Sequence, residues 1–200
     1  MVAEETHRGA AAPPEFAAAV ASLRTAVLRP EVYCEEMPAP QRIAPHATAL
    51  SADVTVDDEE VATGRIVVLH DPEGNAAWDG TFRCVAYCRA EIEGDLATDP
   101  LLTDVGWTWL TDALEAHGAD YGAISGTVTR VQTESYGSMT DDGGSAQLEI
   151  RASWTPHDLP DLARHVEAWG ELLCTAAGME PVPDGVAVMP SRRGQRGAGR

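Results

Sequence analysis

The feature that most constrains the fold is the alternation in residues 82–92, Phe-Arg-Cys-Val-Ala-Tyr-Cys-Arg-Ala-Glu-Ile. Side chains point alternately to the two faces of a β-strand. The even-numbered residues of this stretch are all apolar, whereas the odd-numbered ones include Arg83, Arg89 and Glu91. The alternation predicts a strand of an antiparallel sheet, with one face against a core and the other toward water.

The same alternation bears on Cys84 and Cys88, which both fall on the apolar face. Two residues four apart in a strand are separated by about 13 Å, at ~3.3 Å per residue. A disulfide requires Cα atoms within about 7 Å of each other, and one metal ion cannot span the gap. We therefore expect two thiols packed in the core, and neither a redox pair nor a metal site.

Similar patterns along the chain predict an α+β fold in the order α-β-β-β-α-β-β-α, an antiparallel sheet of about five strands with three helices on one face. Residues 31–46, with three prolines, are expected to form a long connection, with or without a short extended piece. Turns are expected at Asp-Pro-Glu-Gly-Asn and Asp-Asp-Gly-Gly, because these residues favour chain reversal. The predicted strands are 47–56, 59–70, 78–92, 121–139 and 145–154, and the predicted helices are 16–29, 97–118 and 157–178.

Apolar spacing indicates which side of each helix is buried. Leu102, Val105, Trp109 and Ala113 are expected to form the buried stripe of the middle helix, with Gly118 at its C-terminal cap. The last helix has a comparable stripe, formed by Leu162, Val166, Trp169, Leu173 and Ala176.

The domain organisation follows from composition. Residues 1–12 are expected to form a disordered N-terminal tail and residues 13–180 a single α+β domain. Residues 181–200 are rich in Pro, Gly and Arg, and we expect a flexible tail there. This tail is either a solvated end or an arm that contacts acidic surfaces.

The charge excludes some partners. The chain has a formal net charge of −18 and no lysine, so it is expected to repel nucleic acid and anionic membranes. It has no apolar run of signal-peptide or membrane-spanning length, which predicts a cytoplasmic protein with reduced cysteines.

The motifs that accompany common catalytic chemistry are missing. The sequence has no zinc-protease, phosphate-binding, dinucleotide-binding or nucleophile-elbow motif, and its histidines do not cluster. We therefore expect no cofactor, no metal and no enzymatic activity. Catalytic groups that converge from distant positions would escape this argument.

The polar face of the predicted sheet gathers arginines in an otherwise acidic chain. Arg83, Tyr87 and Arg89 share it with Arg151 of the last strand, and Arg65 is a further candidate. One interpretation is ion pairing with glutamates of neighbouring strands on a solvated face. The other is a partner-binding surface, for an acidic protein or for a second copy of the chain.

Two further sets of residues are candidates. Trp107 and Trp109 lie about 200° apart on a helix, so Trp107 either packs at the rim of the core or anchors an interface. If the protein instead binds a small ligand or is an enzyme, we expect a pocket between the middle helix and the sheet. Its candidate lining residues are His117, Tyr121 and Glu134.

The chain resembles a known family in four stretches: "FRCVAYCRAEI", "ATDPLLTDVGWTWLTDALEAHGA", "SGTVTRV" and "EIRASWTP". Together they are similar to the actinobacterial family called domain of unknown function 3000, over about residues 14–180. This resemblance implies an actinobacterial host and a cytosolic location, and it transfers no catalytic residue.

The element order separately resembles the type III secretion chaperone-like fold. That resemblance implies a small, acidic, usually dimeric protein without enzymatic activity, which binds extended segments of other proteins. Fold alone does not fix function. Together with the charge and the arginine-bearing face, it leads us to expect a cytosolic, non-enzymatic protein-binding or regulatory module, chaperone-like or adaptor. The alternative is an enzyme or a small-ligand-binding protein.

Overall fold

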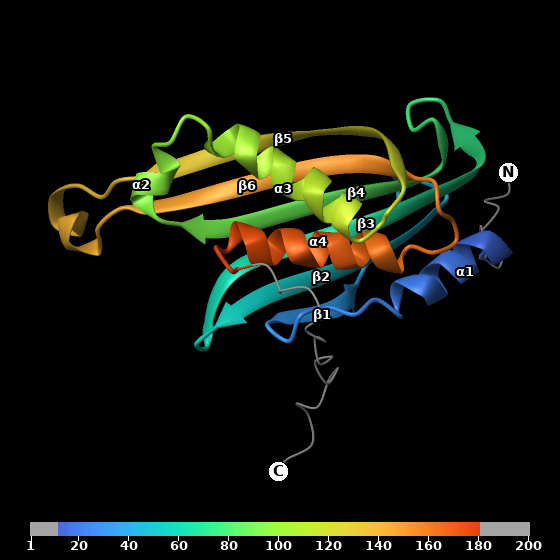
Figure 1. The fold of residues 1–200 in the computed structure, drawn as a ribbon, viewed down its shortest axis with the longest axis horizontal. Helices are drawn as coiled ribbons and strands as arrows, with labels where there is room; N and C mark the ends of the chain where they lie inside the picture. The colour runs from blue at the N-terminus through green and yellow to red at the C-terminus, as the bar shows by residue number, and fades with distance from the viewer. Residues whose placement is uncertain (1–11, 181–200) are drawn as a thin grey trace, which may run out of the picture.

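Apolar alternation produces a six-stranded antiparallel sheet at the centre of the structure, a computed structural model that describes residues 12–180. The strand order is β1-β2-β3-β4-β6-β5, and three helices lie side by side on one face (Figure 1). Apart from Ala12, the two predicted tails lie outside the described residues. The strands are β1 (Val32–Met37), β2 (His46–Val56), β3 (Glu59–Asn75), β4 (Gly80–Ile92), β5 (Tyr121–Thr133) and β6 (Ser145–Pro156).

The helices are α1 (Pro14–Leu23), α2 (Gly94–Ala97), α3 (Leu102–Ala116) and α4 (Ala163–Ala176), with a 3-10 helix η1 (Gly137–Asp142) at the tip of the β5–β6 hairpin. This hairpin extends beyond the helices at one end of the sheet (Figure 1). No helix among residues 12–180 is long and apolar enough to cross a membrane.

The predicted α+β class and antiparallel sheet are confirmed, and β1 and α2 add to the predicted order. β1 lies in the segment expected to be a connection. It pairs with β2 from Val32↔Val54 to Met37↔Ala49. Only Val32 and Cys34 of β1 contact the core, so the strand is too short for alternation to reveal it.

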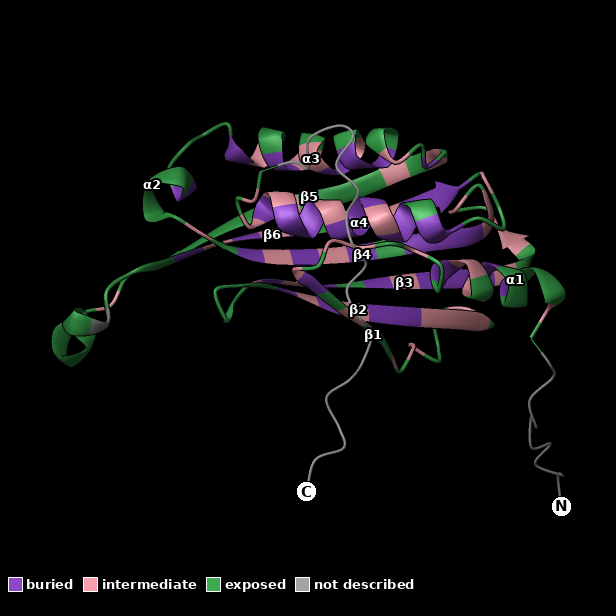
Figure 2. Cartoon of the chain, turned by 60° about the horizontal axis from the view of Figure 1, so that its bottom comes forward, coloured by how far each residue is buried: buried purple, intermediate pink, exposed green. Residues whose placement is uncertain are grey.

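The apolar side of the alternation in β4 is confirmed from Phe82 to Ala90, whereas Ile92 is half-buried and Arg83, on the other face, is buried. Phe82, Cys84, Ala86, Cys88 and Ala90 are all buried, each at most 4% exposed. The strands that flank β4 present apolar side chains in the same register. Burial therefore concentrates between the sheet and the helices, and no helix of residues 12–180 lies on the opposite face of the sheet (Figure 2).

Two hairpin turns show how local chemistry reverses the chain. Asp57 and Asp58, between β2 and β3, both have positive φ, at 51° and 66°, as a two-residue turn of this hand requires. The turn predicted at 71–75 is wrong, because β3 continues to Asn75 and the chain reverses at 76–79. The pairing register shifts after His70, and this irregularity accommodates the Pro and Gly that suggested a turn.

Helix α4 is the centre of the helical layer. Its predicted stripe is confirmed, and Cys174 and Ala168 are buried as well. Gly64 of β3 lets the helix approach the sheet, because a Cβ there would lie 2.6 Å from Leu173 Cδ2. The indole of Trp169 donates a 3.2 Å hydrogen bond to the main-chain carbonyl of Tyr87.

The buried face of α3 agrees with the predicted stripe at Leu102 and Ala113 and differs from it elsewhere. Leu102, Gly106, Leu110, Ala113 and Leu114 are buried, whereas Val105 is 42% exposed. The reason is Gly106, which brings the helix close to the sheet. A Cβ at Gly106 would already lie 3.3 Å from Val128. Trp107 and Trp109 then lie half-buried on either side of this contact line.

The observed C-terminal ends of α3 and α4 agree with the predicted ones, whereas that of α1 does not. Gly118 and Gly178 have positive φ, at 62° and 77°, and follow the last turns of α3 and α4. The amides after them bond back to Leu114 and Cys174, which is the Schellman arrangement. Helix α1, however, ends at Leu23 rather than at Pro30.

The contact between α4 and the sheet at Gly64 gives a direct test of the packing. An alanine Cβ at this position would lie 2.7 Å from the main-chain oxygen of Tyr87, so α4 or β4 must shift. We expect Gly64→Ala to lower the free energy of unfolding by about 1–3 kcal/mol, measured by urea denaturation. Gly94→Ala is the matched control, because nothing lies within 4 Å of its added Cβ. Equal stability of both variants would contradict this packing.

Candidate binding site

The open face of the sheet is organised in rows that run across the strands. Cross-strand pairing places Arg65 of β3 and Arg151 of β6 on either side of Tyr87 of β4. Both guanidinium groups lie over the Tyr87 ring, with Cζ 5.6 Å and 5.3 Å from its centroid. Cations at such distances are attracted to the face of an aromatic ring, so the three side chains form one wall.

Glu149 fixes one side of this wall. It accepts a 3.2 Å hydrogen bond from the Tyr87 hydroxyl and lies 2.7 Å from Arg151 Nη2. Burial, together with the charge of Glu149 and its hydrogen bond, raises the pKa of Tyr87 above its ordinary value. Tyr87 therefore keeps its proton and acts as a donor to the carboxylate.

Arg83 lies on the same face of β4 as Tyr87, four residues before it, and is only 7% exposed. Its Nη1 donates to the Ala123 carbonyl at 2.8 Å and to Thr155 Oγ1 at 3.1 Å. Its Nη2 donates to Ser153 Oγ at 2.7 Å and to Ser125 Oγ at 3.3 Å. All four acceptors are neutral oxygens.

The backbone of β5 is shaped to meet this arginine. The pairing of β5 with β6 is interrupted between Gly122 and Ser125, and Ala123 has a positive φ of 47°. Such a bulge aims a carbonyl away from the ladder, and here the carbonyl of Ala123 accepts from Arg83. Burial lowers the pKa of Arg83 from its ordinary value, although a guanidinium in a protein stays charged.

A hollow of about 540 Å³ lies between the Tyr87 wall and Arg83. Val67 and Val85 form an apolar floor, and Val85 is 38% exposed. Hydroxyl groups of β5 and β6 form the remaining side. The hollow is lined by Arg65, Val67, Val85, Tyr87, Ser125, Thr127, Arg151 and Ser153, with main-chain atoms of Ala86, Gly126 and Ala152.

The structure places the predicted sheet-face residues on one side of the sheet, at different depths. Tyr87 and Arg151 line the hollow, and Arg83 lies buried beside it. Arg89 is half-buried in the next row, opposite Glu149. Sequence reasoning missed the hydroxyl side of the hollow, Ser125, Thr127 and Ser153, because only the strand register shows that these residues adjoin the arginines.

The remaining candidates lie apart from this site. Trp107 lies over Gly126, where a Cβ would come within 2.7 Å of its ring, and is half-buried against the core. His117 ends α3 and lies 3.7 Å from Glu167. Tyr121 begins β5 and Glu134 follows its last residue, about 40 Å away at ~3.3 Å per residue. The structure therefore does not bring His117, Tyr121 and Glu134 into one pocket.

The cysteines are buried in the core on the other side of the sheet. Cys84, Cys88 and Cys174 are at most 1% exposed, and none of the four cysteines forms a disulfide. Burial raises the pKa of Cys88 and of Cys174 to about 12. Among residues 12–180, no three His, Cys, Asp or Glu side chains gather as metal ligands.

Thiol labelling tests this burial. Because only the thiolate is nucleophilic, we expect iodoacetamide at about pH 8 to leave Cys84, Cys88 and Cys174 unmodified in the native protein. Cys34, which is partly exposed, is the only site where labelling is expected. Mass spectrometry with and without denaturant measures this, and rapid native labelling of Cys84 or Cys88 would contradict it.

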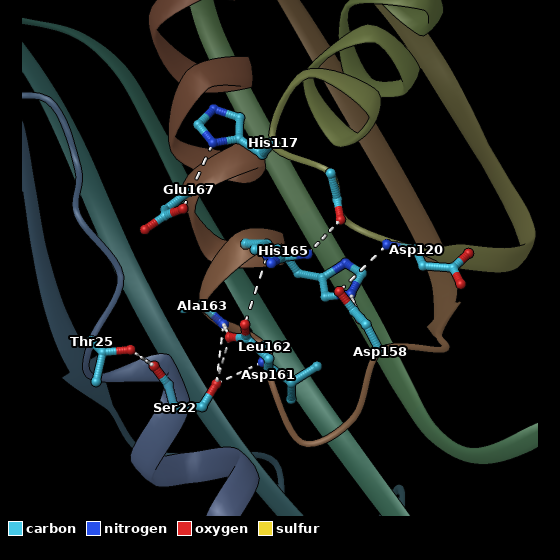
Figure 3. A network of polar contacts seen from close by, with 12 residues as sticks. Ser22, Thr25, His117, Asp120, Asp158, Asp161, Leu162, Ala163, His165 and Glu167 are labelled. Carbon is cyan, nitrogen blue, oxygen red and sulfur yellow. Dashed lines mark hydrogen bonds and ion pairs between the residues drawn. The ribbon is translucent and has the colours of Figure 1, made fainter.

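A second polar cluster lies at the N-terminus of α4 (Figure 3). Trp154 Nε1 donates to His165 Nδ1 at 3.0 Å, and His165 Nε2 lies 2.8 Å from Asp158 Oδ1. An indole nitrogen can only donate, so Nδ1 is unprotonated and Nε2 carries the hydrogen. Asp158 therefore orients His165, while Ser22 of α1 accepts from the main-chain amides of Leu162 and Ala163 at the start of α4.

This arrangement requires neutral His165. Burial lowers the pKa of His165 below its ordinary value, although Asp158 acts in the opposite direction. The unfolded chain then binds a proton at His165 at a higher pH than the folded chain, so this residue reduces stability as pH falls through about 6.5. We expect the free energy of unfolding to fall more steeply with acidification in the wild type than in His165→Gln. Urea denaturation between about pH 8 and pH 5.5 measures both slopes; equal slopes would disprove the assignment.

Comparison with known proteins gives one match. A family model described as "Protein of unknown function (DUF3000)" matches residues 12–187, which confirms the family resemblance seen in the sequence. No curated protein and no solved structure matches the chain. The resemblance to the chaperone-like fold and the actinobacterial origin stay predictions.

Proposed function

Because the chain belongs to the DUF3000 family of proteins of unknown function, a family that assigns no activity, we propose a function from the site itself. The protein is a non-enzymatic, cytoplasmic binding module that captures a segment of a partner protein on the open face of its sheet. The observation that carries this proposal is a set of arginines on that face that form no ion pair with any residue the structure describes.

Among the described residues, one arginine of the open face forms an ion pair. Arg151 pairs with Glu149 at 2.7 Å. Among the described residues, Arg65, Arg83 and Arg89 form no ion pair. Glu149 lies opposite Arg89 in the strand pairing. The cross-strand neighbours of Arg65 are Ser51 and Tyr87, where a face evolved only for solubility could place a carboxylate. The unpaired cations favour an acidic partner.

The charge of the whole molecule does not oppose this preference. Exposed charges are screened beyond about 8 Å at physiological ionic strength, so an approaching segment interacts mainly with the groups beside it. On the open face these are the Tyr87 wall and the hollow. The net charge of −18 instead disfavours partners that cover a large area with acidic groups.

Small-ligand binding is the second candidate function, and the hollow of about 540 Å³ favours it. Its volume falls within the range of ordinary ligand pockets. It lies on the open face of the sheet, whereas the sequence suggested a pocket between α3 and the sheet. Its apolar floor and hydroxyl side would suit a ligand that is partly apolar.

Charge reversal at Arg65 tests the protein-binding proposal. Arg65 is exposed and has no ion pair to lose among the described residues, so Arg65→Glu is expected to fold normally. We expect this variant to lose most of a partner protein that the wild-type chain retains in affinity capture from native cytosol, quantified by mass spectrometry. Rim charges of this kind act on association.

Arg42→Glu is the matched control, because Arg42 is exposed in the β1–β2 connection and does not line the hollow. Circular dichroism confirms that both variants are folded. The proposal fails if both variants capture the same proteins as the wild type. Light scattering tests the alternative that the open face binds a second copy of the chain. A wild-type dimer that Arg65→Glu dissociates would show this.

A further inference from the structure

Beside the hollow lies a positive charge that has no counter-ion among residues 12–180. Arg83 is only 7% exposed, and within the described part of the chain its hydrogen bonds go to neutral oxygens. Burying a charge without an opposite charge is costly. Among residues 12–180 no carboxylate pairs with Arg83, so its positive charge favours an anion in the adjoining hollow.

The hydroxyl groups beside Arg83 have hydrogens to donate. Ser125 Oγ and Ser153 Oγ both accept from Arg83 Nη2, and neither donates to any acceptor among the described residues. Thr155 differs, because its hydroxyl donates to the Trp78 carbonyl. The hollow is thus lined by donors: two serine hydroxyls, Arg65 and Arg151. A ligand in it must supply acceptor oxygens.

The floor of the hollow requires an apolar group as well. Val67 and Val85 lie between the arginine wall and the serines. The central strands β4 and β6 are paired on both sides, so these two strands offer the hollow no cradle of free N–H groups, such as phosphates prefer at loops and helix ends. This favours a carboxylate over a phosphate as the anion.

We infer that the hollow binds a carboxylate carried close to an apolar group, as presented by an acidic side chain two residues from an apolar one in an extended partner segment, where both point to the same side. The carboxylate lies among Arg65, Arg151 and the serine hydroxyls, and the apolar group lies on Val67 and Val85. This inference rests on the proposed function, since it names the chemistry of the partner segment.

Small probes test this chemistry directly. The full-length protein is titrated with 3-phenylpropionate, its neutral analogue 3-phenylpropionamide, and phenyl phosphate, while amide resonances are followed by NMR. We expect 3-phenylpropionate to shift the resonances of Val85, Ser125 and Ser153 at millimolar concentration. The amide analogue is expected to bind about tenfold more weakly, because it lacks the charge-assisted bonds.

Variants assign the effect to the hollow. Arg65→Gln is expected to weaken 3-phenylpropionate binding several-fold, and Arg42→Gln to leave it unchanged. Arg65 is exposed, so the test does not depend on the buried Arg83, whose replacement would disturb folding. Equal affinity for carboxylate and amide, tighter binding of phenyl phosphate, or indifference to Arg65→Gln would each overturn the inference.

The outcome is separable from that of the proposed function. If 3-phenylpropionate does not bind while partner capture still depends on Arg65, the open face binds proteins by other chemistry and the carboxylate inference fails. If the probe binds as expected while partner capture ignores Arg65→Glu, the site is real and the protein-binding function fails.

Discussion

The close contact of α4 with the sheet is the constraint on which the rest of the structure depends. Gly64 removes the side chain that would hold the helix away, and Trp169 bonds to the sheet through the main chain of Tyr87. Leu28 closes over the helix at Gly170, where a Cβ would lie 2.5 Å from it. Together with α1 and α3, helix α4 covers the apolar face of the sheet. The opposite face carries the hollow.

Much of this fold could be predicted from the sequence, because a strand that is buried on one face has alternating apolar and polar residues. The prediction failed where another effect outweighed the pattern. β1 is too short to alternate visibly, and the strand β3 continues through Pro72 because the pairing register shifts there. In α3 the buried side is set by Gly106 and not by Trp109, because the close approach of the helix to the sheet outweighs the burial of a large apolar side chain.

The candidate site was predictable only in part, for a related reason. Alternation assigns Arg83, Tyr87, Arg89 and Arg151 to one face, but it does not show how deeply each side chain is buried, so the burial of Arg83 was not foreseeable. Nor does it show which residues pair across strands, and it is the pairing of strands distant in sequence that brings the serines of the hollow beside the arginines. The pocket suggested near His117 failed to assemble because Tyr121 and Glu134 lie at opposite ends of one strand.

A sheet is only one backbone thick, and Tyr87 uses both of its sides. Its ring forms a wall of the hollow, while its carbonyl accepts the indole N–H of Trp169 in the dry layer beneath. Any ligand that displaces β4 changes the surroundings of that indole without touching it. Trp169 therefore lies directly behind the hollow, and its emission, one of five tryptophan contributions in the chain, would respond to events on a face that it never contacts.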